Sequence, residues 1–432
     1  MEEIVDATSE WTRAECERLD VSDPLSIHRA QFRLPQGLIY LDGNSLGPLP
    51  AGTPGRLAAA VTQEWGDGLI GSWNSAGWIG LPQRVGAKIA SLVGARADEV
   101  VAADSTSVNL FKVLAAAVQL RPDRRTILSE RSNFPTDLYI AQGLVSMLGK
   151  GYRLELVERD ELERLIASPR CRVRRPATML TQVDYRDGSR LDMAAVTARV
   201  HEAGAIAIWD LAHSAGAFPV DLNGARVDFA VGCGYKYLNG GPGAPAFLFV
   251  AREHQPRFIQ PLSGWMGHAH PFEFATEYVP AQGVARYLCG TPSVLALVAL
   301  EEGLDVLLGT QANGGLAALE AKAARLTECF IDLVEEGCSE YGLTLVTPRE
   351  PHRRGNQVSF EMEDGDEAYA VMQALIARGV VGDFRAPNIL RFGFAPLYLR
   401  MVDAWDAAEH VAEVLQMREW DQPRFKQRQA VT

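Results

Sequence analysis

Residues 209–243 read WDLAHSAGAFPVDLNGARVDFAVGCGYKYLNGGPG, and this stretch indicates the fold class. Two apolar runs, ending at Trp209 and at Gly232, have the composition of buried strands. Asp210 directly follows the first run, and Lys236, between two tyrosines, follows the second. In sheets of parallel strands the ligand lies beyond the carboxyl ends of the strands. Polar residues at those ends are therefore candidates for function.

The same alternation continues on both sides of this stretch. Between residues 126 and 250, helical segments separate short β-rich runs, which read TILS, YRLELV, ATMLTQV, AIAIWD, VDFAVG and AFLFV. This order predicts an α/β domain in which helices cover a mainly parallel sheet. Apolar residues at helical spacing over residues 292–310, and again after Gly315, predict a long helix that joins two domains.

The last third of the chain predicts a small α+β domain of strand, strand, helix, strands and helix. With 432 residues the chain is long enough for two or three domains. We expect an N-terminal segment (1–50) that packs with the small domain, a large domain (51–300) and the small domain itself (301–432). The final residues, RFKQRQAVT, are expected to form a frayed tail.

Composition excludes several classes of protein. Hydrophobic residues make up 47% and charged residues 22%, which is typical of a globular enzyme. The net charge of -12 opposes binding to nucleic acid or to an anionic membrane. The acidic N-terminus does not resemble a signal peptide, and no apolar run approaches the roughly 20 residues needed to span a bilayer. Six scattered cysteines favour a reducing cytoplasm.

Asp210 and Lys236 are the two groups that a pyridoxal phosphate (PLP) enzyme needs. A carboxylate beside the ring nitrogen keeps that nitrogen protonated, and a lysine amine forms the Schiff base and acts as the base at Cα. Alone, Asp210 could cap a helix, and Lys236 could be a surface lysine with its stem between aromatic rings. Their combination in an apolar, glycine-flanked setting favours the cofactor.

A phosphate site is predicted where Ser105, Thr106 and Ser107 precede a helical segment, because hydroxyls, backbone amides and the helix dipole converge there. The alternative is a plain N-cap. The hydroxyl of Tyr235 could also bind the phosphate.

Three more residues fit such a site. Phe134 could stack on the cofactor ring, and Asp137 could hydrogen-bond at its edge, although Phe-Pro could equally be a packed turn. Arg391 lies inside an apolar run and needs an anionic partner, either a substrate carboxylate or an internal aspartate.

Other motifs favour ordinary structure. The eight histidines show no metal-ligand spacing, so no metal site is predicted. The glycines of LDGNSLGPLP and GGPGAP are typical of turns, and the basic run at residues 170–176 is typical of a solvated face.

Taken together, the motifs resemble the kynureninase family, PLP enzymes of fold type I in the aminotransferase class V group. They follow the family's order from about residue 40 to 398 and read LDGNSLGPLP, SWNSAGWIGLP, DSTSVNLFKVL, SNFPTDLY, WDLAHSAGA, YKYLNGGPG, SGWMGH, CGTPSVL and LRFGFAPLY. The resemblance implies a seven-stranded sheet in the large domain, hydrolysis of L-kynurenine to anthranilate and L-alanine, and a homodimer with shared active sites. Related cysteine desulfurases carry a histidine where this chain has Phe134.

The resemblance also implies roles for single residues. Lys236 would form the Schiff base and Asp210 would hold the ring nitrogen, with His213 close by. The other cofactor contacts implied are Thr106, Ser107 and Tyr235 on the phosphate, Phe134 and Asp137 at the ring, Thr181 beside it, and Trp265 and Thr291 from the other subunit. The substrate contacts implied are Arg391 on the α-carboxylate, with Asn44, Trp73 and Gly290. Tyr235 with a phosphate oxygen is a candidate relay to the hydrolytic water.

Trp73 and the Gly290-Thr291 pair resemble bacterial-type members, which favour kynurenine over 3-hydroxykynurenine. Two alternatives stay open. One is another class V activity, an aminotransferase or a desulfurase, and the other is a non-catalytic protein on the same fold. The presence of Lys236, Asp210 and Arg391 together disfavours the second alternative.

Overall fold

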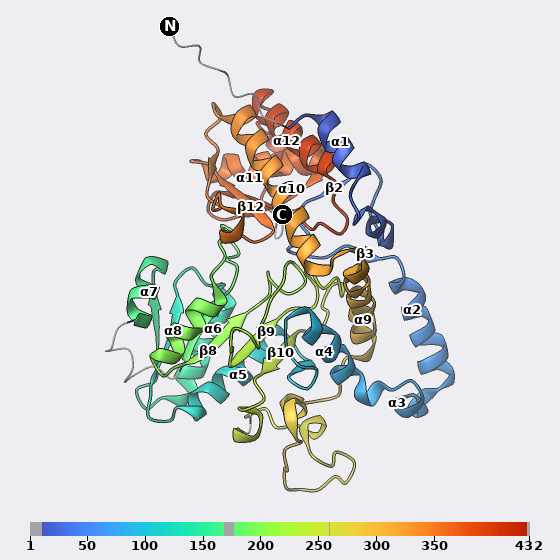
Figure 1. Ribbon diagram of the computed structural model, residues 1–432, viewed down its shortest axis with the longest axis vertical. Helices are drawn as coiled ribbons and strands as arrows, with labels where there is room; N and C mark the ends of the chain where they lie inside the picture. Colours follow the sequence, from blue (N-terminus) through green and yellow to red (C-terminus); the bar gives the residue numbers. More distant parts are fainter. Residues whose placement is uncertain (1–10, 168–176, 259, 430–432) are drawn as a thin grey trace. The chain divides into compact units, whose positions relative to one another are not determined.

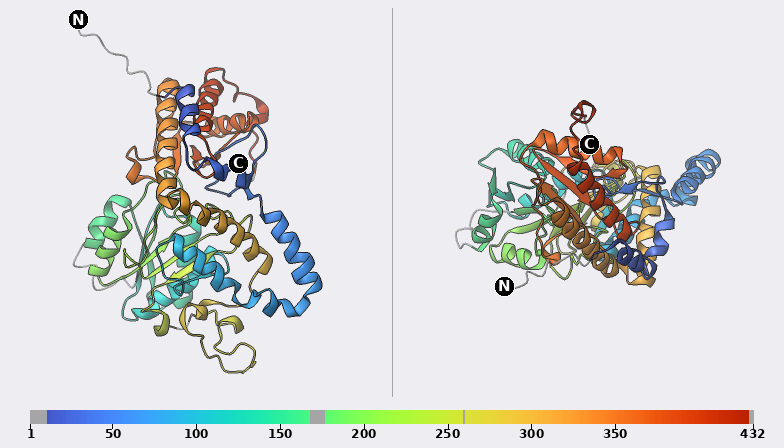
Figure 2. Two further views of the ribbon diagram at one scale, coloured as in Figure 1. Left: turned by 45° about the vertical axis from the view of Figure 1, so that its right-hand side comes forward. Right: turned by 90° about the horizontal axis from the view of Figure 1, so that it is seen from above.

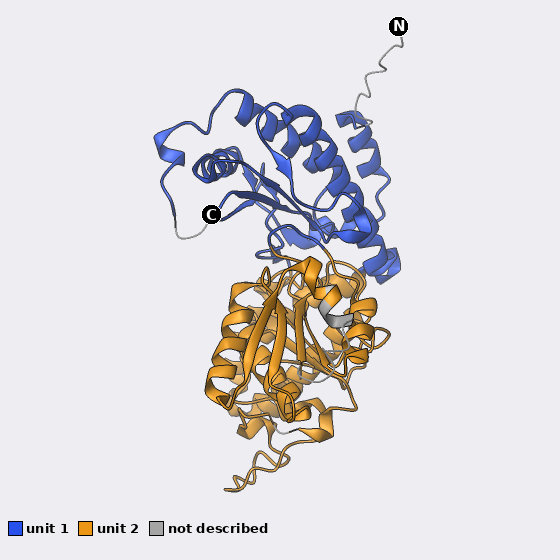
Figure 3. Ribbon diagram, turned by 90° about the vertical axis from the view of Figure 1, so that its left-hand side faces the viewer, with its two compact units in different colours: residues 1–51, 186–189, 310–432 blue, residues 52–185, 190–309 orange. Residues whose placement is uncertain are grey.

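The computed structural model describes residues 11–167, 177–258 and 260–429 (Figure 1). The chain divides into two compact units (Figure 3). Unit 1 comprises residues 1–51, 186–189 and 310–432, and unit 2 comprises residues 52–185 and 190–309. The sequence did not predict that residues 186–189 belong to unit 1. Ser189 forms a β-bridge with Arg354 of that unit. The predicted basic face at 170–176 lies outside the described residues. Within the described ranges no helix is long and apolar enough to cross a membrane.

Unit 2 is built on a seven-stranded sheet, in the order β4-β10-β9-β8-β7-β5-β6. Its strands are β4 (Val100–Ala102), β5 (Thr126–Glu130), β6 (Arg153–Val157), β7 (Ala177–Thr181), β8 (Ile206–Asp210), β9 (Phe229–Gly232) and β10 (Phe247–Val250). Strands β5 to β9 are parallel, while β10 is antiparallel to both β9 and β4. The predicted α/β class with a mainly parallel sheet is therefore confirmed.

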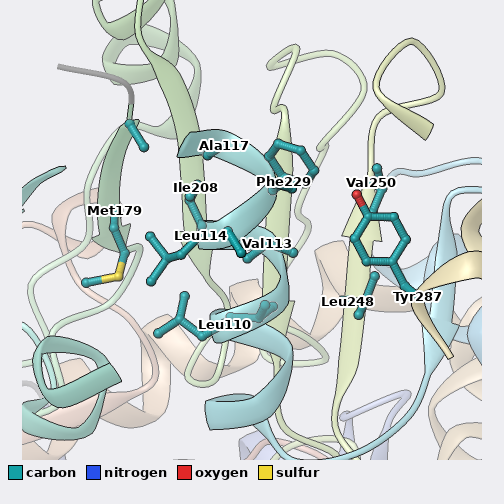
Figure 4. Close-up of a cluster of buried hydrophobic side chains, with 14 of the residues drawn as sticks. Leu110, Val113, Leu114, Ala117, Met179, Ile208, Phe229, Leu248, Val250 and Tyr287 are labelled. Carbon is teal, nitrogen blue, oxygen red and sulfur yellow. The ribbon is translucent and has the colours of Figure 1, made fainter. Parts of the chain in front are cut away.

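Alternation along β8 assigns helices to the two faces of this sheet. Ile206 and Ile208 belong to the apolar cluster beneath α5 (Thr106–Leu120), as Figure 4 shows for Ile208. Trp209 points to the opposite face, where its Nε1 donates to Thr197 Oγ1 on α8 (Met193–Glu202) at 3.0 Å. Asp210, next in the alternation, returns to the α5 face.

The other helices of unit 2 frame this core. They are α2 (Thr53–Ala59), α3 (Ser72–Ser75), α4 (Leu81–Leu92), α6 (Pro135–Leu148), α7 (Arg159–Ala167) and α9 (Val294–Leu308). Helices α2 and α4 both pack on α9, as the left view of Figure 2 shows. Helix α6 packs on α5, which brings the start of α6 to the carboxyl end of β8.

Unit 1 has the predicted α+β character. Its four-stranded antiparallel sheet has the order β11-β12-β15-β14 and consists of β11 (Thr344–Leu345), β12 (Gln357–Glu361), β15 (Ile389–Gly393) and β14 (Asp383–Arg385). Its helices are α1 (Arg13–Val21), α10 (Gly315–Cys338), α11 (Gly365–Ala377) and α12 (Met401–Gln416). Two two-stranded pairs complete the unit, β1 (Phe32–Arg33) with β3 (Leu49–Pro50) and β2 (Ile39–Tyr40) with β13 (Val380–Val381).

The two helical stretches predicted at residues 292–310 and after Gly315 are present as α9 and α10, and residues 309–314 separate them, where Gly314 has left-handed backbone with φ of 95°. The prediction for the last residues was wrong. The tail is not frayed through Gln429. Phe425 is buried, and the Arg428 guanidinium lies 4.6 Å from the ring centre of Tyr369. This cation–π contact and the burial of Phe425 hold the segment against the rest of unit 1.

Candidate active site

A cavity of about 620 Å³ opens at the carboxyl ends of the parallel strands, and all of its lining residues belong to unit 2. This volume lies within the roughly 300–1,000 Å³ of small-molecule sites. The predicted residues that line it are Ser105, Thr106, Ser107, Phe134, Asp137, Thr181, Asp210, His213, Tyr235, Lys236, Gly290 and Thr291. Predicted residues up to 186 positions apart in the chain therefore meet at one cavity, since residue 105 and residue 291 both line it.

Lys236 lies on the tight loop that follows β9. Its Nζ is 2.8 Å from Nε2 of His213, which is itself only 4% exposed. The loop is folded closely on itself, because a Cβ at Gly234 would lie 2.3 Å from the carbonyl oxygen of Pro245. Glycine is therefore required there for close backbone approach. The result is a lysine amine held against an imidazole inside the cavity.

Two buried carboxyl groups, Asp137 and Asp210, interact at the same cavity. Asp137 comes from the first turn of α6 and Asp210 from the end of β8. Burial first, and then the negative charge of Asp210, holds the pKa of Asp137 well above its usual range. Burial also raises the pKa of Asp210, but the backbone amide of Ala212, donating at 2.7 Å, opposes that rise. Both pKa values are raised, and that of Asp137 is raised further, so Asp137 is the partner that holds a proton more readily.

Helix α5 begins at the cavity. Ser105 is its N-cap, with Oγ accepting from the amide of Val108 at 3.3 Å, so the plain capping alternative holds for this residue. Thr106 and Ser107 are the first two helical residues and both line the cavity. Amides of a first helical turn have no partner within the helix, and they attract anions together with the helix dipole.

Phe134 offers an aromatic surface to this cavity. It immediately precedes α6 and is 41% exposed, an unusual amount for a phenylalanine beside a core. Its amide donates to Asn133 Oδ1 at 2.7 Å, and Thr181 Oγ1 donates to the same oxygen at 2.5 Å. Tyr185 packs edge-on against its ring, with the ring centres 5.2 Å apart.

The hydroxyl of Tyr235 remains protonated near neutral pH. Burial is the largest cause of its raised pKa, and the neighbouring Cys233 and Asp210 add to the rise. Tyr235 is therefore a hydrogen-bond donor rather than a base in the cavity.

Among the lining residues that sequence reasoning missed are Tyr185, Met266 and Cys289. Tyr185 follows the carboxyl end of β7 by four residues, and this position was a usable signal. Cys289 is two residues before Thr291, and its Sγ donates to the carbonyl oxygen of Leu262 at 2.6 Å. Burial raises the pKa of this thiol, which disfavours a nucleophilic thiolate.

Two predicted tryptophans lie outside the described lining of the cavity. Trp73 is on α3, with its ring edge-on to Trp78 at 6.1 Å. Trp265 packs on the core cluster, with its ring edge-on to Phe272 at 5.6 Å. Its neighbour Met266 reaches the cavity instead. Thr291, by contrast, lines the cavity of its own chain, whereas the resemblance implies that it serves the other subunit.

The predicted substrate residues Arg391 and Asn44 belong to unit 1. Arg391 is 1% exposed and has an internal aspartate partner: its Nε donates to Asp383 Oδ1 at 2.8 Å, and its Nη2 donates to Ser45 Oγ at 2.8 Å. Asn44 is equally buried, and its Oδ1 has no hydrogen-bond partner among the described residues. A Cβ at Gly393 would lie 1.9 Å from that oxygen, so glycine makes room for Asn44 on β15.

One histidine and acid cluster lies apart from the cavity lining. Asp228, Glu253 and His254 bring one potential ligand atom each within 4.8 Å. The Asp228 carboxylate already accepts from His201 Nε2 at 2.7 Å, His254 Nε2 at 2.6 Å and the amide of Ala207 at 2.8 Å. These hydrogen bonds account for the cluster as structure.

The cavity fits a cofactor with an aldehyde, a cationic ring nitrogen and a phosphate. Lys236 supplies the amine, the N-terminus of α5 supplies donors for an anion, and the exposed Phe134 ring supplies a stacking surface. The raised pKa values of Asp137 and Asp210 mark a place where a positive charge would be stabilised. These are the features of PLP.

Comparison with known proteins agrees with a PLP site. A family model described as the kynureninase C-terminal domain matches residues 319–411. The kynureninase of Pseudomonas fluorescens is 52% identical over 426 residues, which are 98% of this chain and 100% of the relative. That of Burkholderia mallei is 51% identical over 430 residues, again 98% of this chain and 100% of the relative.

Solved structures share the fold at low identity. A cysteine desulfurase from Thermococcus onnurineus superimposes with a TM-score of 0.74 at 18% identity, covering 91% of this chain and 98% of the other. A mutant of C-DES with glycine covalently linked to its PLP cofactor gives a TM-score of 0.73 at 18% identity, covering 89% of this chain and 98% of the other. Likeness at such identity shows the fold alone.

Proposed function

The chain belongs to the kynureninase family of PLP-dependent hydrolases, and we propose that the cavity around Lys236 is its active site. The family reaction is hydrolysis of the Cβ–Cγ bond of L-kynurenine to anthranilate and L-alanine. The observation that carries the proposal is the meeting of Lys236, His213, Asp210, Asp137 and the start of α5 at one cavity. PLP, when bound, withdraws electrons from Cα of an amino-acid substrate.

Lys236 is proposed to hold the cofactor covalently and to move the Cα proton. Its amine is fixed by His213 at 2.8 Å, so it keeps one position in the cavity. Asp210 would supply the negative charge that holds a protonated ring nitrogen, and Asp137, whose pKa is raised by burial and by the charge of Asp210, would stay neutral beside it.

The phosphate is proposed to lie at the N-terminus of α5, on Thr106 and Ser107. The hydroxyl of Tyr235 serves the same group as a donor, because its raised pKa keeps the proton in place. The Phe134 ring stacks on the cofactor, and Thr181, which bonds Asn133, lies beside it. Tyr235 with a phosphate oxygen is also the proposed proton relay to the hydrolytic water: the hydroxyl would pass its own proton to that oxygen as it takes one from the water, so it need not lose its proton beforehand.

On the substrate side, Arg391 is proposed to bind the α-carboxylate, with Asn44, Trp73 and Gly290 as further contacts. Asp383 accepts from both Nε and Nη2 of the guanidinium and so fixes its plane, which orients the group toward a carboxylate. Unsubstituted kynurenine is the proposed preferred substrate over 3-hydroxykynurenine.

We further propose a homodimer in which Trp265 and Thr291 serve shared active sites. Thr291 already lines the cavity of its own chain, so this proposal needs the cavity to lie at the subunit interface. A cytoplasmic location stays a prediction from cysteine usage.

The direct test mixes the purified holoenzyme with L-kynurenine and follows anthranilate fluorescence, with Lys236→Ala as the control. We expect anthranilate from the wild type and none from the variant. An absorbance band of the lysine-bound cofactor, present in the wild type and lost in Lys236→Ala, tests the attachment separately. Wild-type protein that carries PLP but releases no anthranilate would refute the proposed reaction.

A further inference from the structure

Lys112 is a fully buried lysine on the second turn of α5, with none of its surface exposed. Its Nζ donates to Asp104 Oδ2 at 2.6 Å and to the carbonyl oxygen of Tyr287 at 2.6 Å. A buried ammonium is strongly destabilising unless it is paired and hydrogen-bonded. Both partners of Lys112 belong to segments that lead into the cavity, so its placement bears on the site.

Asp104 is the first of these partners. It lines the cavity, directly precedes the N-cap Ser105, and has left-handed backbone with φ of 51°. A residue other than glycine keeps such a conformation only where its surroundings hold it. Two bonds do so here: its carbonyl oxygen accepts from the amide of Ala246 at 2.9 Å, and its carboxylate accepts from Lys112.

Tyr287 is the second partner. Its ring is fully buried near Leu248 and Val250, as Figure 4 shows, so the backbone at this point is anchored. The next residues, 288–291, all line the cavity. We call this segment the rim. The rim is also held by the amide of Met266, which donates to the carbonyl oxygen of Cys289 at 3.2 Å.

We propose that Lys112 is a positioning residue that ties the phosphate loop, residues 104–107, to the rim and thereby sets the affinity for PLP. One ammonium binds Asp104 in the cavity lining and the carbonyl oxygen of Tyr287, which directly precedes the rim. This inference rests on the proposed function only in taking PLP as the ligand. Lys112 does not touch the reacting atoms, so its loss weakens cofactor binding rather than the chemical step.

The test compares two variants. Lys112→Met removes the link and leaves Asp104 unpaired. The double variant Asp104→Asn with Lys112→Met removes the link as well but leaves no unpaired charge, and asparagine tolerates left-handed backbone. PLP is removed from each protein, and its dissociation constant is measured by the absorbance of the rebuilt lysine-bound cofactor. Then kcat is measured at saturating PLP.

We expect both variants to bind PLP about tenfold more weakly or worse, and Lys112→Met to keep kcat at saturating PLP within about threefold of wild type. If Lys112 only pairs with the charge of Asp104, the double variant recovers the wild-type dissociation constant, and the proposal fails. The double variant carries the test by itself if Lys112→Met does not fold.

Lys88→Met is the matched control. Lys88 lies on α4 and also has two partners, Glu301 at 3.1 Å and Asp305 at 2.6 Å, and none of the three lines the cavity. Its PLP affinity should equal that of wild type. Because the readout is PLP binding, wild-type protein that binds PLP but releases no anthranilate would refute the proposed reaction and leave this inference standing.

Discussion

Asp137 and Asp210 carry unequal roles although they are the same residue type. Asp137 is held protonated by burial and by the charge of Asp210, so asparagine can replace it as a neutral donor. We expect Asp210→Asn to lower kcat by roughly 10²–10⁴, and Asp137→Asn by less than about tenfold. Steady-state kinetics at saturating PLP measures both. Equal losses in the two variants would contradict the assignment of the proton.

Asp42 in unit 1 gives a pH dependence of stability. Burial, followed by the negative charge of Asp383, raises its pKa to about 7 in the folded protein, against about 3.9 in an unfolded chain. Between these values the folded state holds a proton that the unfolded state has released. The stabilisation is therefore complete below about pH 4 and is lost as the pH rises through about 7.

Asp42→Asn cannot titrate, so the variant should lack this loss. We expect the unfolding free energy of the variant, measured relative to that of wild type at the same pH, to be larger at pH 8 than at pH 5. Denaturant unfolding of both proteins at the two pH values measures the difference. The same change in unfolding free energy between pH 5 and pH 8 in both proteins would show that Asp42 does not titrate as described.

At the level of elements, α9 supports the loop that carries Lys236. A Cβ at Gly303 would lie 2.3 Å from the carbonyl oxygen of Leu238 and 2.7 Å from Asn239, which are two and three residues after Lys236 in the chain. We expect Gly303→Ala to lower stability by about 1–3 kcal/mol and to weaken the absorbance of the lysine-bound cofactor, because the loop must move.

Gly309→Ala is the control for that substitution. Gly309 follows the same helix, and nothing lies within 4 Å of a Cβ built there. Thermal unfolding and the cofactor absorbance should both match wild type. Alanine is favoured over glycine inside helices by about 1 kcal/mol. A loss of stability in Gly303→Ala, with none in Gly309→Ala, would therefore come from the clash of the new Cβ with the loop. If both variants had the unfolding temperature and the cofactor absorbance of wild type, α9 would not support the loop that carries Lys236.

At the scale of the whole molecule, the net charge of -12 opposes the approach of PLP, whose phosphate carries about -1.5 to -2 at neutral pH. Salt screens this repulsion. We expect the association rate constant of PLP with the cofactor-free enzyme to rise about twofold between about 10 mM and 150 mM salt. Stopped-flow absorbance measures it, and neutral pyridoxal, without the phosphate, should show no rise. A rate that falls with salt would mean that local positive charge governs the encounter.

Sequence patterns determined the elements and the chemistry of the site. Two strands, with an acid and a lysine at their ends, were predicted from residues 205–210 and 227–236. Such a prediction is possible because the spacing of apolar residues and the end of a strand depend on residues close together in the chain. The same local signals predicted the sheet of unit 2 and the α+β character of unit 1. The family followed from motifs in a fixed order.

Only the tertiary structure decided which side chains meet. Asp137 and Asp210 are 73 positions apart and interact because α6 starts near the end of β8. The order of the strands in the sheet sets this proximity. Arg391 has an internal partner, Asp383 on the adjacent antiparallel strand, and strand register brings the two together. The short edge strand β4 and the reach of Lys112 to Tyr287 had no local signal either. Partners far apart in the chain are set by packing, which no local period encodes.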